Sequence, residues 1–372
     1  MPIRPFARGR ALAALLCFAL CAVGPAAARD HRPPAVVGET FVSQAVAEDE
    51  LDSLATWRHP DGTQWLIASG KSSHRLVIFD AETGARLRTF GEKGSDPGRF
   101  KRPNGLAVAG DRLFVVERDN HRVQVFALPD FAPLGSFGEA QLRAPYGLWL
   151  NTTVDGADGA IDVYVTDSFM DGANYDVVPP LAQLDQRVRR YRVRFGADGA
   201  LEADALGHFG DAREASALRM VESIGGDRER GTLLIADEFV DRAQRRDSTL
   251  REYTLDGEFT GRSAPRGSFE AEAEGVALWR CAKSRRFSRG FWIAVDQRQD
   301  LTAFRLFDRD TLAARGGFVG RVVAATDGIA LRTAPSPRFP AGALFAVHRD
   351  KAVAAFDLRD VARALKLPAR CP

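Results

Sequence analysis

The sequence of 372 residues has no excess of charge of either sign. Its 51 lysines and arginines stand against 49 aspartates and glutamates, which gives a net charge of +2. Arg4, Arg8 and Arg10 lie in a segment that we expect to be removed, and without them the balance is 48 − 49 = −1. A balanced chain has no bulk attraction to nucleic acid or to anionic lipid, so neither is indicated as a partner.

Long hydrophobic runs are scarce. The apolar stretch from Ala11 to Val23 is shorter than the roughly 20 residues that a membrane-spanning helix needs, and no later segment approaches it. It follows the three arginines and precedes Pro25-Ala26-Ala27-Ala28, a small-residue pattern that signal peptidase cleaves. We therefore expect residues 1–28 to be a signal peptide. The mature chain would then be periplasmic or extracellular, with no membrane anchor.

Cysteine is also rare, with four in the whole chain. Cleavage would leave Cys281 and Cys371, which in an oxidising compartment either form one disulfide at the C-terminus or remain separate thiols. The sequence leaves both possibilities open. It has no phosphate-binding loop, no His-Glu-x-x-His, no Gly-x-Ser-x-Gly and no cysteine cluster, so the enzyme classes that these motifs mark are not indicated.

A unit of short apolar strands recurs six times. In each copy a first strand starts near a small residue, a second strand ends in polar residues, and a third strand follows. The small residues of five copies are Gly105, Gly147, Ser223, Gly275 and Gly328, and a less regular first copy includes Leu54. A repeat of this kind with almost no helical pattern predicts an all-β fold, a six-bladed β-propeller with four-stranded antiparallel blades.

The propeller would be one domain over residues 29–372. We expect the strand from Val36 to Ser43 to complete the last blade and close the ring. The long interval between the third and fourth copies holds an insertion from Asp171 to Gln186, which contains two prolines and predicts a surface loop.

The repeat brings polar residues to one face, because first strands start where second strands end. Strand starts contribute Asp52, Glu222, Glu272, Glu274 and Asp327. Strand ends contribute Lys71, Glu117, Arg118, Asp167, Asp237, Glu238, Asp296, Gln297 and His348. Taken singly, each is more often a solvated strand end, but converging carboxylates repel one another unless cations lie among them, and an oxygen-rich site suits Ca²⁺.

Short motifs over nearly all of the mature chain resemble the β-propeller phytases. The segment 271–275 resembles their Asp-x-Glu-Gly, and 326–329 resembles their Thr-Asp-Gly-Ile-Asp. Val221-Glu222 is similar to their Thr-Glu-Gly, and 235–238 to their Ile-Ala-Glu-Glu. The opening segment 52–57 is similar to Asp-Asp-Pro-Ala-Ile-Trp. Lys71, Arg118 and Tyr146 fall on a lysine, an arginine and a tyrosine of the family.

The resemblance implies a secreted calcium-dependent phosphomonoesterase that hydrolyses phytate, myo-inositol hexakisphosphate, with a metal-activated water. It implies that calcium or its water is held by Asp52, Glu222, Glu238, Glu272, Glu274, Gln297 and Asp327. Glu222 and Glu238 are the expected catalytic residues, and Lys71, Arg118 and Tyr146 the expected contacts to substrate phosphate. A guanidinium pairs two phosphate oxygens at once, and a hard cation lowers the pKa of its water. We expect a monomer with a small phosphorylated partner.

Other residues favour a different function. Ser53 and Leu54 stand where the phytase motif has its second Asp and its Pro, and the chain has only six lysines. The segments 98–108 and 119–126 resemble an NHL repeat, a propeller unit that often binds partners without catalysis. The alternatives are therefore a non-catalytic propeller that binds a protein or glycan, and an envelope scaffold that calcium makes rigid.

Overall fold

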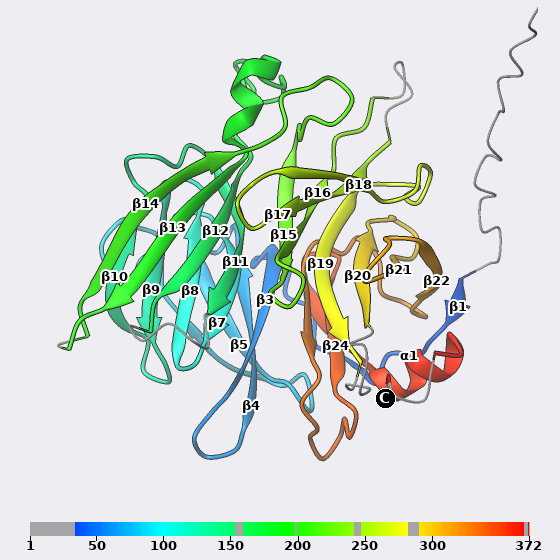
Figure 1. The fold of residues 1–372 in the computed structure, drawn as a ribbon. Helices are drawn as coiled ribbons and strands as arrows, with labels where there is room; N and C mark the ends of the chain where they lie inside the picture. Colours follow the sequence, from blue (N-terminus) through cyan, green and yellow to red (C-terminus); the bar gives the residue numbers. More distant parts are fainter. Residues whose placement is uncertain are drawn as a thin grey trace, which may run out of the picture.

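A computed structural model describes residues 34–152, 159–197, 199–241, 247–281, 290–367 and 371. The expected signal peptide, residues 1–28, lies outside these residues. The described chain is almost entirely β, and its sheets form six blades around a central axis (Figure 1). The predicted six-bladed β-propeller with four-stranded antiparallel blades is confirmed.

Each of the first three blades is a meander of four consecutive strands. Blade one contains β3 (Leu51–Arg58), β4 (Gln64–Gly70), β5 (Arg75–Asp80) and β6 (Arg86–Phe90). Blade two contains β7 (Pro103–Ala109), β8 (Arg112–Glu117), β9 (Arg122–Ala127) and β10 (Ala132–Phe137). Blade three contains β11 (Pro145–Thr152), β12 (Ile161–Asp167), β13 (Val188–Phe195) and β14 (Leu201–Phe209).

The last three blades follow the same order, with additions from the N-terminus. Blade four contains β15 (Val221–Asp227), β16 (Thr232–Asp237), β17 (Thr249–Thr254) and β18 (Phe259–Ser263). Blade five contains β19 (Ala273–Arg280), β20 (Gly290–Asp296), β21 (Ala303–Asp308) and β22 (Ala314–Val319). Blade six contains β23 (Ile329–Arg332), β24 (Ala343–His348) and β25 (Ala352–Asp357), completed by β2 (Phe41–Val42).

The N-terminal segment closes the ring as predicted, because β2 pairs antiparallel with β25 as the outer strand of blade six. One strand was not expected: β1 (Ala35–Val36) adds to the outer edge of blade five, parallel to β22. Figure 1 shows β1 near the C-terminal helix α1 (Leu358–Ala364). The insertion between β12 and β13 contains a short 3₁₀ helix, η1 (Leu181–Gln186).

The core consists of six apolar clusters, each between two neighbouring blades. Second strands such as β16 and β20 are buried along their whole length, because adjacent blades cover both of their faces. The outermost strand β6 is exposed at four of its five residues. Because second strands are buried on both faces, they are continuous apolar runs in the sequence.

The two cysteines left by the expected cleavage form a disulfide. Cys281 follows β19, and Cys371 lies beyond α1 at the C-terminus, with their Cα atoms 4.4 Å apart. Both side chains belong to the apolar cluster between blades five and six, together with Val361 of α1. The bond therefore ties the C-terminal helix to blade five.

Candidate functional site at the mouth of the propeller

Each blade contributes one side chain to a ring at one end of the axis. In five blades the register of the innermost strand shifts directly after its first residue, and the ring residue is the one at that shift. The sixth member precedes β23, where Gly328 N donates to the backbone oxygen of Asp52. We call these side chains the mouth ring: Asp52, Asn104, Tyr146, Glu222, Glu274 and Asp327.

Small residues next to the mouth ring allow the innermost strands to approach closely. A Cβ atom on Gly147 would lie 2.2 Å from the backbone oxygen of Glu222, and one on Gly105 would lie 2.5 Å from that of Tyr146. Real Cβ atoms do not approach backbone oxygen so closely. The glycines that mark the repeat in the sequence are therefore the residues that let the mouth ring converge.

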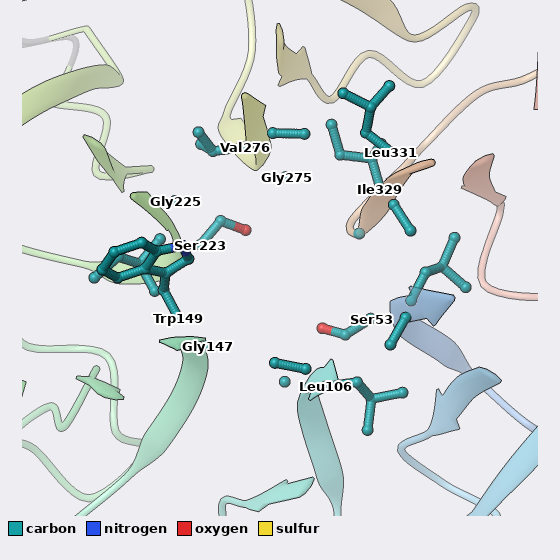
Figure 2. Close-up of a pocket in the computed structure, with 18 of the residues that line it drawn as sticks. Ser53, Leu106, Gly147, Trp149, Ser223, Gly225, Gly275, Val276, Ile329 and Leu331 are labelled. Carbon is teal, nitrogen blue, oxygen red and sulfur yellow. The ribbon is translucent and has the colours of Figure 1, made fainter. Parts of the chain in front are cut away.

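A central channel of about 440 Å³ begins directly behind the mouth ring. Its wall is made by the next residues of the innermost strands, and Figure 2 shows Ser53, Ser223, Val276 and Ile329 around the central space. Arg228 and Arg280 also line the channel, but no carboxylate is found in its lining among the described residues. The acidic groups are thus concentrated at the mouth.

Three carboxylates of the mouth form a compact group. One carboxylate oxygen from each of Glu222, Glu238 and Glu274 lies within 4.8 Å of the other two. Glu238 directly follows β16, which places its carboxyl beside the start of the neighbouring innermost strand. We call these three residues the acidic trio. All three were predicted from the sequence as metal ligands, and the fold brings them together.

Lys71 neutralises another part of the mouth. Its Nζ lies 2.9 Å from Asp52 Oδ2 and 3.1 Å from Asp327 Oδ2, so it joins blade one to blade six. Tyr146 donates from its hydroxyl to the same Asp52 oxygen, at 3.3 Å. Gln297 donates from its amide nitrogen to Asp327 Oδ1. In the described part of the chain, no ion pair to a basic residue is found for the acidic trio.

The pKa values of the mouth carboxylates follow from their burial and from the excess of carboxylates over basic groups around them. Burial and the neighbouring carboxylates raise the pKa of Glu222 and of Glu274 well above the usual range. Burial raises the pKa of Glu238 to about 7, and burial with the Asp52 charge raises the pKa of Asp327 to about 7. Burial alone would lower the pKa of Lys71, but the surrounding carboxylates outweigh it and raise that pKa, so the side chain is an ammonium.

Two predicted site residues lie apart from these contacts. Arg118 is about 38% exposed in its side chain and donates to Asp119 at 2.7 Å. Glu272 is exposed, and its backbone oxygen accepts from the backbone nitrogen of Gln297 at 2.9 Å. Among the described residues Arg118 has no contact with the acidic trio, whereas the charge of Glu272 helps to raise the pKa of Glu238, after burial. The roles of both residues stay predictions.

The acidic residues that end second strands have a structural role. Asp167 accepts from the backbone nitrogens of Arg143 and Ala144, and Asp237 accepts from those of Arg219 and Met220. Corresponding contacts to the loop before the innermost strand are made by Glu117 in blade two, Asp296 in blade five and His348 in blade six. These five side chains hold the loops that lead to the mouth ring and are not part of it.

Sequence reasoning missed Asn104, the mouth-ring member from blade two. Its counterparts in other blades attracted attention because they are acidic or match a motif. The signal that identifies Asn104 is its position, directly before Gly105, as Glu274 stands before Gly275 and Asp327 before Gly328.

Comparisons with known proteins add one repeat family. Residues 100–126 match the family model described as NHL repeat. No curated protein matches the chain. Among solved structures, a similar chain is the hydrazine synthase of Kuenenia stuttgartiensis, 14% identical over 88% of this chain and 82% of that chain, with a TM-score of 0.43.

The strand topology and the NHL match define the class as a six-bladed β-propeller with an NHL-like repeat in its second blade. Within the residues that the structure describes, no helix has both the length and the apolar character needed to cross a membrane.

Proposed function

We propose that the protein is an exported, monomeric, calcium-dependent phosphomonoesterase of the phytase type, acting on phytate-like small molecules. The observation that carries this proposal is the acidic trio, three buried or half-buried carboxylates within 4.8 Å. None of them forms an ion pair with a basic residue in the described part of the chain. The phytase-like motifs named above supply the reaction, since they contain the trio, Lys71 and Tyr146.

The donor set at the mouth fits calcium. All of the converging ligand atoms are oxygens, and Ca²⁺ takes six to eight of them in flexible geometry. Burial and the neighbouring carboxylates raise the pKa of Glu222 and of Glu274, and a divalent cation would offset this penalty on their ionised forms. When bound, calcium supplies charge neutralisation and Lewis-acid activation of water and phosphate. The acidic trio, with Asp52, Asp327 and Gln297, would hold it.

The remaining chemistry belongs to the chain itself. Glu238 is the residue that we assign to accept a proton from an attacking water, because it directly follows β16 and lies beside Glu222 and Glu274 at the mouth. Lys71 offers an ammonium and Tyr146 a hydroxyl close to the same carboxylate oxygen, where both can also donate to phosphate oxygens. Arg118, from the neighbouring blade, is the second basic group that we assign to substrate phosphate.

A second candidate function rests on blade two. The NHL match covers residues 100–126, and the mouth-ring residue of that blade is an amide, not a carboxylate. In this alternative the propeller binds a protein or glycan and performs no hydrolysis.

The deciding experiment is release of inorganic phosphate from phytate by the purified chain, with calcium added and then chelated. We expect release that requires calcium and that is restored when calcium is returned. A complete lack of release over a range of pH and calcium concentration would contradict the enzymatic proposal and leave the binding module. A parallel assay with p-nitrophenyl phosphate tests whether the substrate must carry several phosphates.

A further inference from the structure

The side-chain amide of Asn104 is buried without a hydrogen-bond partner among the described residues. The residue is fully buried, and neither its amide nitrogen nor its carbonyl oxygen has a hydrogen-bond partner among the described residues. A buried polar group without a partner costs about 1–3 kcal/mol. Such groups are rare in folded proteins, and one that persists points to a water, an ion or another ligand.

The fold directs Asn104 into the mouth. Its register on β7 is that of the other mouth-ring residues, directly at the shift between Pro103 and Leu106. Its neighbours in the order of the blades are Asp52 and Tyr146, whose side chains lie 3.3 Å apart. The charges of Asp52, Glu222, Glu274 and Asp327 all act on Tyr146, so these side chains share one space. The register of β7 gives Asn104 the equivalent position in blade two.

The surroundings decide which ligand suits this amide. An oxyanion is disfavoured, because the space already contains several carboxylates and Asn104 is closed to solvent. A lone water would satisfy the amide but leave the carboxylates uncompensated. A hydrated divalent cation would compensate the carboxylates and also give the Asn104 side chain its partners. The carbonyl oxygen is a ligand type that Ca²⁺ accepts, and the side-chain nitrogen can donate to another oxygen ligand of the ion.

We propose that the carbonyl oxygen of Asn104 is a ligand of a divalent, oxygen-preferring cation held at the mouth of the propeller. This inference rests on the metal part of the proposed function and adds a neutral ligand from blade two, one of the two blades whose mouth-ring residue is not a carboxylate. It requires calcium binding but no hydrolysis, so binding measurements test it directly.

The test is calorimetric titration of Ca²⁺ into the full mature chain and its variants, with thermal unfolding in EDTA and in calcium. Asn104→Leu should weaken calcium binding at least tenfold and shrink the calcium-induced rise in Tm. In EDTA its Tm should equal or exceed that of the parent, because two unpaired polar atoms are removed. Asn104→Asp, which keeps the shape and adds a charged oxygen, should tighten calcium binding.

A matched control is Asn151→Leu, which changes a buried amide near the far end of an innermost strand. Its calcium affinity should equal that of the parent. Unchanged affinity in Asn104→Leu would overturn the inference. If that variant also loses stability in EDTA, Asn104 binds a buried water instead.

Should Asn104→Leu fail to fold, Asn104→Asp still decides, since calcium affinity that is unchanged there over pH 5 to 8 would also overturn the inference. If the parent chain binds no calcium, both this inference and the proposed function are wrong. A parent that binds calcium and hydrolyses phytate, with variants of equal affinity, would remove only the inference.

Discussion

The hydroxyl of Tyr146, on the third blade, lies 3.3 Å from Oδ2 of Asp52, on the first blade, and the same oxygen lies 2.9 Å from Nζ of Lys71. A contact that passes over blade two is possible because the glycines of the innermost strands let their backbones touch. A single carboxylate oxygen thus connects the predicted substrate-binding lysine and tyrosine.

Tyr146→Phe removes this hydroxyl and leaves the ring in place. Loss of one hydrogen bond should lower the free energy of unfolding by about 1 kcal/mol. If Tyr146 also contacts phosphate, kcat/KM for phytate should fall about tenfold, equivalent to about 1.4 kcal/mol of transition-state stabilisation. Initial rates of phosphate release and denaturant unfolding curves measure the two effects separately.

A matched control is Tyr164→Phe. Tyr164 is buried, and its hydroxyl donates to the backbone oxygen of Leu255 at 3.0 Å, away from the mouth. It should lose similar stability with no change in kcat/KM. Equal activity in the two variants would show that the Tyr146 hydroxyl has only a structural role.

Glu222→Gln should raise the Tm when calcium is absent and reduce the stabilisation by calcium when it is present. Without the ion, removing one of several mutually repelling buried carboxylates should raise the Tm, since burial and neighbouring charges already disfavour the ionised form. With calcium, the variant should lose most of the calcium-induced rise in Tm and its phytase activity. Differential scanning fluorimetry in EDTA and in calcium measures both. Glu258→Gln, at an exposed turn, is the control and should behave like the parent.

The raised pKa values predict how stability depends on pH when calcium is absent. Glu238 and Asp327 have pKa values of about 7 in the folded state, against about 4 in an unfolded chain. Between these values the folded state binds more protons, so the free energy of unfolding should fall as pH rises from about 4.5 to about 7. Carboxyl groups with lowered pKa values, such as Asp211, act below this window. His74 and His348, whose pKa values burial lowers, act within it in the opposite direction but are fewer than the carboxyl groups with raised values.

Urea unfolding in EDTA at several pH values measures this trend, and Glu238→Gln should reduce its slope. Calcium binds the deprotonated carboxylates, so calcium affinity should increase over the same interval. Stability in EDTA that rises from pH 4.5 to 7 would be incompatible with the protonation described here.

The disulfide should stabilise the fold without contributing to the site. Cys281 and Cys371 are 90 residues apart, and a loop of that length predicts a loss of about 4 kcal/mol when the bond is removed. Cys281→Ser should lower the Tm and speed proteolysis near α1. Calcium affinity should not change, because the bond lies between blades five and six, near α1. A reduced calcium affinity in this variant would show that the C-terminus supports the mouth.

Several features of the site follow from the sequence because the repeat is regular. Short apolar runs with a small residue at the start of each first strand predicted the six blades, and the acidic residues next to those positions predicted Glu222, Glu274 and Asp327 as neighbours. Glu238 and Lys71 followed from the rule that second strands end where first strands begin. Each of these residues is identified by its position within the repeat, and that position can be determined from the sequence alone.

Side-chain partners could not be predicted in the same way. Asp167 and Asp237 looked equivalent to the trio from their positions, but each is used to hold the backbone nitrogens of a loop. Arg118 pairs with Asp119, its own neighbour. Which way a side chain turns at a strand end depends on the loop packed against it, and a loop has no periodic pattern to reveal this.

The sequence by itself determined the number of blades, the strand that closes the ring and the acidic character of one face, because hydrophobic periodicity and glycine positions are local properties. Only the tertiary structure decided which carboxylates converge, that Lys71 joins Asp52 to Asp327 and that the two cysteines are bonded. It also decided that Asn104 is buried with no hydrogen-bond partner for its side chain among the described residues. These are contacts between residues on different blades, and their distances are set by how closely the innermost strands pack around the axis.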